Sequence, residues 1–398
     1  MPESTKPSST RPATPPTAPQ PQKHFKVDGN RLTLLIAGPA RLKALIGLID
    51  GAKQTLRLLY YIYTDDDTGR EVRAAMARAL ERGVKVSLIV DGFGSSAKPD
   101  FFRPLQDLGA DVCHFLPRYG RRYLLRNHQK LALADEHHAI VGGFNVEHYH
   151  FDEVKGWRDL GICVEGPAAQ RLAGYFDTLA KWTHQPQARL RDLRHALGRW
   201  SNPKGGHACW LLGGPTRRLN PWARALRSDV GRTKRLDIIA AYFAPTPRMM
   251  RAIERVCKRG GEARVITPSK TDHNVAIAAA RHTYHRLLSR GVRVFEYQPL
   301  KLHTKLFVID DVVHIGSANF DVRSLFLNLE IMLRVDDKAF ADHMRSYFDG
   351  EIADSREITV EQHEKVGFLT RLRWAAAYYL MAVVDASVTR RLNFGVNR

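Results

Sequence analysis

The sequence predicts an α/β fold made of two similar lobes, each a mixed β-sheet flanked by helices. Two observations support this fold class. A strand-helix-strand pattern occurs twice in the same order, and one short polar motif occurs twice at matching places within those patterns. A chain of 398 residues is long enough for two domains of ordinary size, each with a full hydrophobic core.

The first half begins with a near-continuous apolar run at residues 56–64, which is typical of a buried strand. Thr68 is predicted to open a helix, because Glu71 three residues later completes a capping box, and Gly83 ends it. Residues 84–90 are predicted to return as a second strand.

The second half repeats this order of elements. Residues 236–243 predict a strand, and residues 263–266 predict the strand that returns beside it. Between them, Thr246 is a predicted N-cap, and Pro247 suits the first helical position that follows. An internal duplication explains the matching order and spacing of the two halves.

Composition divides the chain into five segments. The first is rich in proline, serine and threonine, cannot bury enough apolar surface to offset its ordering entropy, and is predicted to be disordered. The predicted segments are a disordered arm at 1–24, a first lobe at 25–184, a basic linker at 185–207, a second lobe at 208–360, and a basic, aromatic helical segment at 361–398.

The chain carries 61 lysines and arginines against 41 aspartates and glutamates, a net charge of +20. Such a surplus favours a polyanionic partner, either nucleic acid or an anionic membrane surface, and does not choose between them. Four basic residues that lead into the first copy of the motif would serve either partner: Arg118, Arg121, Arg122 and Arg126.

Other bulk features limit the cellular setting. No stretch approaches about eighteen consecutive apolar residues, and no apolar signal segment opens the chain, so we expect no transmembrane helix. The 4 cysteines are scattered and form no Cys-x-x-Cys pair, which argues against a disulfide framework or a zinc site and fits a reducing compartment.

A motif of histidine, lysine and aspartate occurs once in each half and is followed by small and amide residues. The two copies comprise His128, Lys130, Asp135 and Asn145 in the first half, and His303, Lys305, Asp310, Ser317 and Asn319 in the second.

The spacing within the motif separates two kinds of residue. A histidine and a lysine two positions apart in a strand point to the same face of the sheet. The aspartate lies five residues beyond the lysine, on the opposite parity and at a predicted hairpin turn. We therefore expect it to fix the turn or a neighbouring side chain rather than to reach the substrate.

These residues resemble the paired HKD motifs of the phospholipase D superfamily, in which each lobe contributes one motif. Residues 316–330, GSANFDVRSLFLNLE, resemble the bacterial cardiolipin synthase branch, as do Trp157-Arg158-Asp159 and the VEGP of residues 164–167. The similarity covers roughly residues 30–350. It implies that the two lobes pack as a pseudo-dimer with one active site between them.

The resemblance also implies residue roles. The motif residues form the catalytic set, namely His128, Lys130, Asp135, His303, Lys305 and Asp310. His128 would attack phosphorus to give a phosphatidyl-histidine, and His303 would act as general acid and base. Lys130, Lys305, Asn145, Ser317 and Asn319 would bind the phosphate oxygens. Asp159 and Glu330 would hydrogen-bond the second imidazole nitrogens and set their tautomers.

No metal or other cofactor is expected, because no cluster of carboxylates has the spacing of a metal site. The expected function is a phosphatidyltransferase that makes cardiolipin from phosphatidylglycerol, with a second phosphatidylglycerol or another phospholipid as its partner. The alternatives are a phospholipase D that hydrolyses phospholipids, a nuclease of the same fold, and a membrane- or DNA-binding protein with a decayed site. Intact histidines and lysines in both motifs argue against the last.

The C-terminal segment bears on the choice of partner. Residues 369–388 combine an apolar, aromatic centre around Trp374 with Arg371 and Arg373, so they suit either a membrane interface or packing on the second lobe. We expect anionic phospholipids and a membrane surface as partners, nucleic acid as the alternative, and no obligate protein partner. The expected location is peripheral, at the cytoplasmic face of the cell membrane, and otherwise cytoplasmic.

Overall fold

The computed structural model describes residues 23–116, 125–185, 188–202, 205–216, 219–271 and 273–384. Most of the predicted arm at 1–24, three of the basic residues before the first motif, and the chain beyond residue 384 lie outside these ranges. His24 already belongs to the first strand, so the predicted boundary of the arm falls inside an ordered element.

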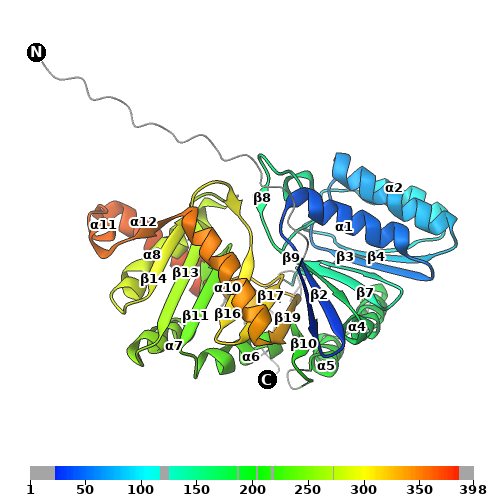
Figure 1. The fold of residues 1–398 in the computed structure, drawn as a ribbon. Helices are drawn as coiled ribbons and strands as arrows, with labels where there is room; N and C mark the ends of the chain where they lie inside the picture. The colour runs from blue at the N-terminus through cyan, green and yellow to red at the C-terminus, as the bar shows by residue number, and fades with distance from the viewer. Residues whose placement is uncertain are drawn as a thin grey trace, which may run out of the picture.

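Two eight-stranded mixed sheets form the two halves of the molecule (Figure 1). In spatial order, the first sheet contains β1 (His24–Val27), β2 (Asn30–Leu35), β9 (Gly161–Glu165), β7 (His138–Gly142), β6 (Leu131–Ala134), β3 (Thr55–Tyr60), β4 (Lys85–Asp91) and β5 (Asp111–Phe115). The second contains β10 (Ala208–Gly213), β19 (Glu330–Asp336), β17 (Val312–Gly316), β16 (Lys305–Ile309), β11 (Arg235–Ala240), β13 (Glu262–Pro268), β14 (Arg293–Tyr297) and β20 (Ser355–Ile358).

The two sheets share one succession of strand pairings. From β2 to β5 in the first sheet and from β10 to β14 in the second, four antiparallel pairings are followed by two parallel ones. Only the outermost strands differ, with β1 added at one edge of the first sheet and β20 at the opposite edge of the second. This repeat confirms the predicted duplicated α/β fold.

Helices flank each sheet. They are α1 (Gly38–Gly51), α2 (Asp67–Glu81), α3 (Pro99–Asp107), α4 (Pro167–His184), α5 (Leu190–Trp200), α6 (Pro221–Val230), α7 (Pro247–Lys258), α8 (Asn274–Leu288), α9 (Val322–Phe326) and α10 (Lys338–Ala353).

The two predicted helix starts had different outcomes. Thr246 caps α7 as predicted, since its hydroxyl accepts a hydrogen bond from the N–H of Met249 at 3.3 Å. The predicted cap of α2 at Thr68 was wrong. Asp66 caps this helix instead, and its carboxylate accepts from the N–H of Gly69 at 2.8 Å.

The two lobes share one hydrophobic core in addition to the core on the outer side of each sheet. The shared core joins apolar residues of β7 and β9 from the first sheet to residues of β17 and β19 from the second. Such a continuous buried contact is what packing as a pseudo-dimer requires, because two independent domains would each bury their own faces.

The predicted basic linker at residues 185–207 contains a helix. Leu193, Ala196 and Leu197 of α5 are buried, and the two leucines belong to the shared core. The description of this segment as a linker was therefore incomplete. Arg191 and Arg199 lie on the exposed face of this amphipathic helix, which packs against α4 and β10, whereas the half-buried Arg194 donates to the carbonyl of Pro215 at 2.7 Å.

Short backbone pairings connect the lobes where both motifs begin. β8 (Trp157–Arg158) pairs in parallel with β15 (Lys301–Leu302), and Asn127 forms an isolated bridge with Leu329. The chain of each lobe is thus hydrogen-bonded to the other lobe beside its own motif histidine.

The described part of the C-terminal segment forms α11 (Val360–Glu364), α12 (Phe368–Tyr379) and a π-helical turn (Leu380–Val384). α12 packs against α8, and the Tyr378 hydroxyl donates to the carbonyl of Pro245 at 2.8 Å. Phe368, Leu369 and Leu372 remain exposed. None of the helices formed by the described residues is both long enough and apolar enough to span a bilayer.

Candidate active site

Both motif histidines lie at the junction of the lobes. The backbone N–H of His128 donates to the carbonyl of Leu329 at 3.0 Å, and that of His303 donates to the carbonyl of Arg158 at 2.7 Å. Each acceptor immediately precedes one of the two predicted orienting carboxylates, Glu330 and Asp159. The same backbone contact therefore fixes a histidine and brings a carboxylate beside it.

Each imidazole is paired with the carboxylate of the opposite lobe. His128 Nδ1 lies 3.1 Å from both carboxylate oxygens of Glu330, and His303 Nδ1 lies 2.7 Å from Asp159 Oδ2. In the sequence, each carboxylate follows the histidine of its own half, but in space the pairing is crossed. A carboxylate only accepts hydrogen bonds, so the proton resides on Nδ1, and Nε2 of each ring keeps its lone pair.

The two motif lysines are buried beside their histidines. Lys130 Nζ donates to the carbonyl of His128 at 2.6 Å, and Lys305 Nζ makes the equivalent bond to the carbonyl of His303. Burial lowers the pKa of Lys130 to about 7; the charge of Glu330 opposes this shift, and that of Lys305 adds to it. The charge of Lys305 acts on Lys130, so the two ammonium groups favour the binding of an anion between them.

Burial also governs the acid–base state of the histidines. It lowers the pKa of His128 to about 4 against the opposing charge of Glu330, and lowers that of His303 to about 3, with Lys305 adding to the shift. Burial alone would raise the pKa of Asp159, but the charges of His303 and Lys305 and hydrogen bonds from the neighbouring imidazoles hold it well below its usual range. Both motif histidines are thus neutral at pH 7 while no anion is bound.

The predicted phosphate-binding residues divide into two groups. Asn145 and Asn319 are both buried next to their motifs, and the Asn319 Oδ1 atom has no hydrogen-bond partner among the described residues. Ser317 has a different task from the predicted one. Its hydroxyl donates to Glu330 Oε2 at 2.5 Å and accepts from the N–H of Ile331 at 3.0 Å, so it orients the carboxylate rather than presenting a free donor to phosphate.

The motif aspartates lie away from the histidines, at hairpin turns. Asp135 accepts hydrogen bonds from the backbone N–H groups of residues 53, 54 and 55, and Asp310 accepts from those of residues 234 and 235. Both adopt a left-handed backbone, with φ of 50° and 48°. Their place in the catalytic set is therefore corrected: they hold the starts of β3 and β11 against the turns, as their parity in the motif had suggested.

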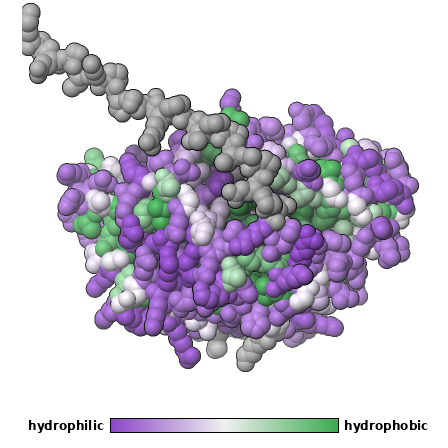
Figure 2. Space-filling model, in the orientation of Figure 1, coloured by the Kyte–Doolittle hydropathy of each residue, from purple (hydrophilic) through white to green (hydrophobic). Residues whose placement is uncertain are grey.

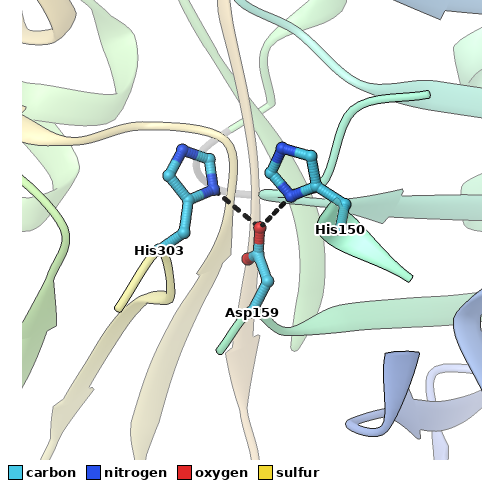
Figure 3. A group of neighbouring side chains, drawn as sticks. All are labelled: His150, Asp159 and His303. Atoms are coloured by element: carbon cyan, nitrogen blue, oxygen red, sulfur yellow. Dashed lines mark hydrogen bonds and ion pairs between the residues drawn. The ribbon is translucent and has the colours of Figure 1, made fainter. Parts of the chain in front are cut away.

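A third histidine, which the sequence reasoning missed, belongs to the site. His150 closes the short 3-10 turn at His148–His150, is fully buried, and places Nδ1 3.3 Å from the same Asp159 oxygen that receives His303 (Figure 3). Among the described residues, His150, Asp159 and His303 are also the one group with the spacing of metal ligands, all within 4.8 Å of one another. Because Asp159 already lies between the two imidazoles, hydrogen-bonded to His303 and 3.3 Å from His150 Nδ1, we interpret the group as two imidazoles arranged around one carboxylate.

A buried arginine, which the sequence analysis also missed, holds the backbone of His150 and Asp159 in place. Arg41 on α1 is 1 % exposed, and its guanidinium donates to the carbonyls of His150 at 2.6 Å and Asp159 at 2.7 Å. It also reaches the carbonyls of Ile36 and Trp157. A guanidinium has five N–H donors, and here they bind loop carbonyls instead of an acidic partner.

Aromatic rings flank both histidines. The ring of Tyr61 lies 4.9 Å from that of His128, edge to face, and the ring of Trp157 lies 5.1 Å from that of His303. These rings help to shield the imidazoles from water, which strengthens every electrostatic interaction within the site.

Known proteins share this fold and these sequence features. The family model described as "Cardiolipin synthase, PLD-like domain" matches residues 45–180 and 229–352. Cardiolipin synthase A of Pseudomonas entomophila (strain L48) is 32% identical over 354 residues, which cover 86% of this chain and 73% of that protein. Cardiolipin synthase A of Pseudomonas fluorescens (strain Pf-5) is 29% identical over 366 residues, covering 89% of this chain and 75% of that protein.

Among solved structures, phosphatidylserine synthase of Haemophilus influenzae Rd KW20 has a similar fold, with a TM-score of 0.68 at 13% identity, over 92% of this chain and 95% of that one. The fold alone is what a likeness at such low identity shows. The family follows from the sequence matches, which span both lobes and both halves of the site. The chain belongs to the cardiolipin synthase family of phospholipase D-like proteins.

Proposed function

We propose that this chain is a phosphatidyltransferase that makes cardiolipin, using phosphatidylglycerol as donor and the hydroxyl of a second phosphatidylglycerol, or of another phospholipid, as acceptor. One observation carries the proposal: two buried imidazoles, one from each lobe, each have Nδ1 bound to a carboxylate of the other lobe. This arrangement supplies one nucleophile and one acid–base group to a single phosphodiester. The relatives named cardiolipin synthase A support the choice of lipid substrate.

The reaction would proceed in two displacements. In the first, His128 Nε2 forms a bond to phosphorus while the bond from phosphorus to the glycerol oxygen breaks, and His303 gives its Nε2 proton to that oxygen. In the second, His303 takes the proton from the incoming hydroxyl, whose oxygen bonds to phosphorus as the bond to His128 breaks. The product is a diphosphatidyl lipid, and the histidines return to their starting states.

Charge in the site supports this scheme. Lys130, Lys305, Asn145 and Asn319 would hold the non-bridging oxygens as negative charge builds on them in the transition state. The same anion would raise the depressed pKa of His303 and so allow this imidazole to carry the proton it must donate. An empty site keeps both rings neutral, and a phosphodiester would itself create the acid.

We further propose that the protein works as a peripheral enzyme on an anionic membrane, at its cytoplasmic face. The face shown in Figure 2 is largely hydrophilic, in keeping with the net charge of +20. At the end of the second lobe, the exposed side chains of Phe368, Leu369 and Leu372 lie close in the chain to Arg371 and Arg373. Exposed apolar side chains can enter the headgroup region, and each arginine near anionic lipid adds about 1 kcal/mol.

The function can be tested with purified protein and vesicles of phosphatidylglycerol, with and without phosphatidylethanolamine, followed by mass spectrometry of the lipids. We expect cardiolipin and free glycerol from phosphatidylglycerol. A parallel reaction with labelled single-stranded DNA tests the nuclease alternative. Degradation of DNA without formation of cardiolipin would overturn the proposal, and phosphatidic acid as the main product would indicate a hydrolase.

The histidine roles need a separate test. His128→Asn and His303→Asn should each abolish turnover, because each removes one of two indispensable groups. Intact-mass measurement after rapid quenching should detect a phosphatidyl adduct in the wild-type protein and none in His128→Asn. Turnover that survives either substitution would contradict the two-histidine scheme, and an adduct on His303 would reverse the assignment of the two roles.

Membrane binding has its own variant. Leu369→Glu places a charge in the exposed apolar patch of α12 and should weaken co-sedimentation with phosphatidylglycerol vesicles. Turnover of a short-chain, monomeric phosphatidylglycerol should be unaffected, because the patch lies outside the catalytic site. Equal binding by the variant and the wild-type protein would exclude α12 as the contact.

A further inference from the structure

We propose that His150 is a positioning residue of this active site: it stays neutral, directs its Nδ1 proton to Asp159, and thereby fixes the carboxylate that orients His303. The inference rests on the proposed function in one respect, since it is that function which assigns proton transfer to His303. Neither motif contains His150, and it lies at the end of the loop that follows Asn145.

The protonation state of His150 follows from its neighbours. Asn145 Oδ1 accepts a hydrogen bond from the backbone N–H of Ile62 at 3.1 Å, which fixes the orientation of this amide. Its Nδ2 group must then donate to His150 Nε2, 3.2 Å away. A nitrogen that accepts a hydrogen bond carries no proton, so the proton of the neutral ring is on Nδ1, the atom that faces Asp159.

Three N–H groups from two lobes surround Asp159: those of Leu160 and His303 donate hydrogen bonds to it, and that of His150 faces it at 3.3 Å. Its Oδ1 atom accepts from the N–H of Leu160 at 2.8 Å. Its Oδ2 atom faces Nδ1 of His303 at 2.7 Å and Nδ1 of His150 at 3.3 Å, with the two rings on either side of it (Figure 3). With each oxygen occupied, the carboxylate cannot rotate away from His303 without breaking a buried hydrogen bond.

The backbone around His150 is built to hold this position. Arg41 donates from both Nε and Nη2 to the His150 carbonyl and from Nη1 to the Asp159 carbonyl. One buried guanidinium thus fixes the two residues relative to each other. The ring of Trp157 packs edge to face on His150 at 4.7 Å, which limits rotation of the imidazole.

In the other half of the site, different residues hold the corresponding carboxylate, that of Glu330. Ser324 has the same spacing from Asn319 as His150 has from Asn145, and its hydroxyl donates to Glu330 Oε1 at 2.7 Å. Glu330 also receives the hydroxyl of Ser317, whereas the matching residue in the first half is Gly143. A side chain there would collide with Asp159, because a Cβ at Gly143 would fall 2.3 Å from its Oδ1 atom.

The comparison indicates what His150 contributes. Glu330 is held by two hydroxyls, each of which can rotate its proton to another acceptor. Asp159 instead faces the planar ring of His150, whose Nδ1 proton has one direction. The two half-sites therefore differ in stiffness, and the stiffer one faces His303, the group that must pick up and release a proton within each cycle.

Two substitutions at His150 separate hydrogen bonding from simple space filling. In His150→Asn, the amide nitrogen can take the place of Nδ1 and keep a donor towards Asp159. In His150→Gln, the larger side chain fills more of the space but carries its amide nitrogen towards the place of Nε2. A positioning role predicts that Asn retains most of the activity and that Gln and Ala lose it; a packing role predicts the reverse order for Asn and Gln.

We expect His150→Ala to lower kcat about ten- to a hundredfold, the range expected when a carboxylate loses one hydrogen bond, with little change in KM. His314→Asn is the matched control. His314 is equally buried, and its Nε2 atom lies 2.8 Å from Asp229 Oδ2, outside the candidate site. It should lower the melting temperature without lowering kcat. A KM effect at His150, or equal kcat in the Gln and Asn variants, would overturn the proposal.

A measurement without substrate keeps this test independent of the proposed function. In protein labelled with nitrogen-15 at histidine, long-range proton–nitrogen spectra report the tautomer of each ring, and the His150 and His303 variants assign the signals. We expect the Nδ1–H tautomer for both rings in the wild-type protein, and a mixture for His303 in His150→Ala. A single unchanged tautomer of His303 in that variant would refute the positioning role, whether or not the protein makes cardiolipin.

Discussion

Asp159→Asn should nearly abolish catalysis while leaving the fold intact. The amide oxygen of the new side chain must stay on Leu160, because that buried N–H otherwise loses its acceptor. The amide NH2 group then replaces Oδ2 and points its protons at Nδ1 of His303. That nitrogen has to become an acceptor, so the His303 proton moves to Nε2, the atom that receives the proton of the incoming hydroxyl in the proposed mechanism.

The size of the effect can be worked from the distance. A unit charge at 2.7 Å from the protonated ring of His303 stabilises it by about 6 kcal/mol at an effective dielectric constant of 20. Loss of that interaction corresponds to about 10⁴-fold in rate. A similar loss of about 10⁴ accompanies replacement of the orienting carboxylate by an amide in a Ser-His-Asp triad, where the wrong tautomer is also the cause.

The assay is the initial rate of cardiolipin formation from phosphatidylglycerol vesicles, measured from pH 5 to 9. Asp135→Asn is the matched control, because it makes the same chemical change in a motif residue that binds only backbone at a turn. It should lower the melting temperature by about 2–4 °C, with kcat within a few-fold of the wild-type value. The reasoning fails if Asp159→Asn retains more than about a tenth of the wild-type rate, or if Asp135→Asn loses as much.

Three further predictions concern neighbouring groups. The affinity for inorganic phosphate, measured by calorimetry, should fall as the pH rises through about 7. The reason is that the anion binds better to protonated Lys130, whose pKa is lowered to about 7. The Lys130→Met variant should bind phosphate more weakly at pH 6 and lose this pH dependence. Arg41→Met should lower the free energy of unfolding in urea by about 3–5 kcal/mol, since buried loop carbonyls lose their donors, and an unchanged midpoint would show that water replaces the guanidinium. Gly143→Ala should lower kcat more than tenfold because its Cβ displaces Asp159, whereas Gly47→Ala, with open space around the new methyl group, should leave kcat unaltered and not lower the melting temperature.

The repeated strand order could be predicted because it is local. Apolar runs, helix starts and glycine stops recur in both halves, and each depends on a few adjacent residues. Helix α5 was missed for a related reason. Its buried Leu193 and Leu197 lie among arginines in the sequence, so the basic composition of the segment outweighed its narrow apolar face. That face is buried only because the two lobes pack together around it.

The candidate site was predicted in its parts but not in its connections. The spacing of the motifs identified both histidines and both lysines, and the resemblance supplied the two carboxylates. The crossed pairing depends on how the lobes dock, with partners 202 and 144 residues apart in the chain, and no local pattern encodes that. His150 was missed because the two halves were compared for identical residues. The residue at the equivalent position of the second half is Ser324, not a histidine.

The crossed pairing has a consequence for symmetry. In a dimer of two identical chains, every contact across the axis is made twice with the same residues, so two such half-sites could only be equal. One chain that carries both halves is released from this rule, and each half can change without altering the other. The pairs Gly143 with Ser317 and His150 with Ser324 show that this freedom has been used here. It would suit the proposed reaction, in which the two histidines perform different tasks at the same moment.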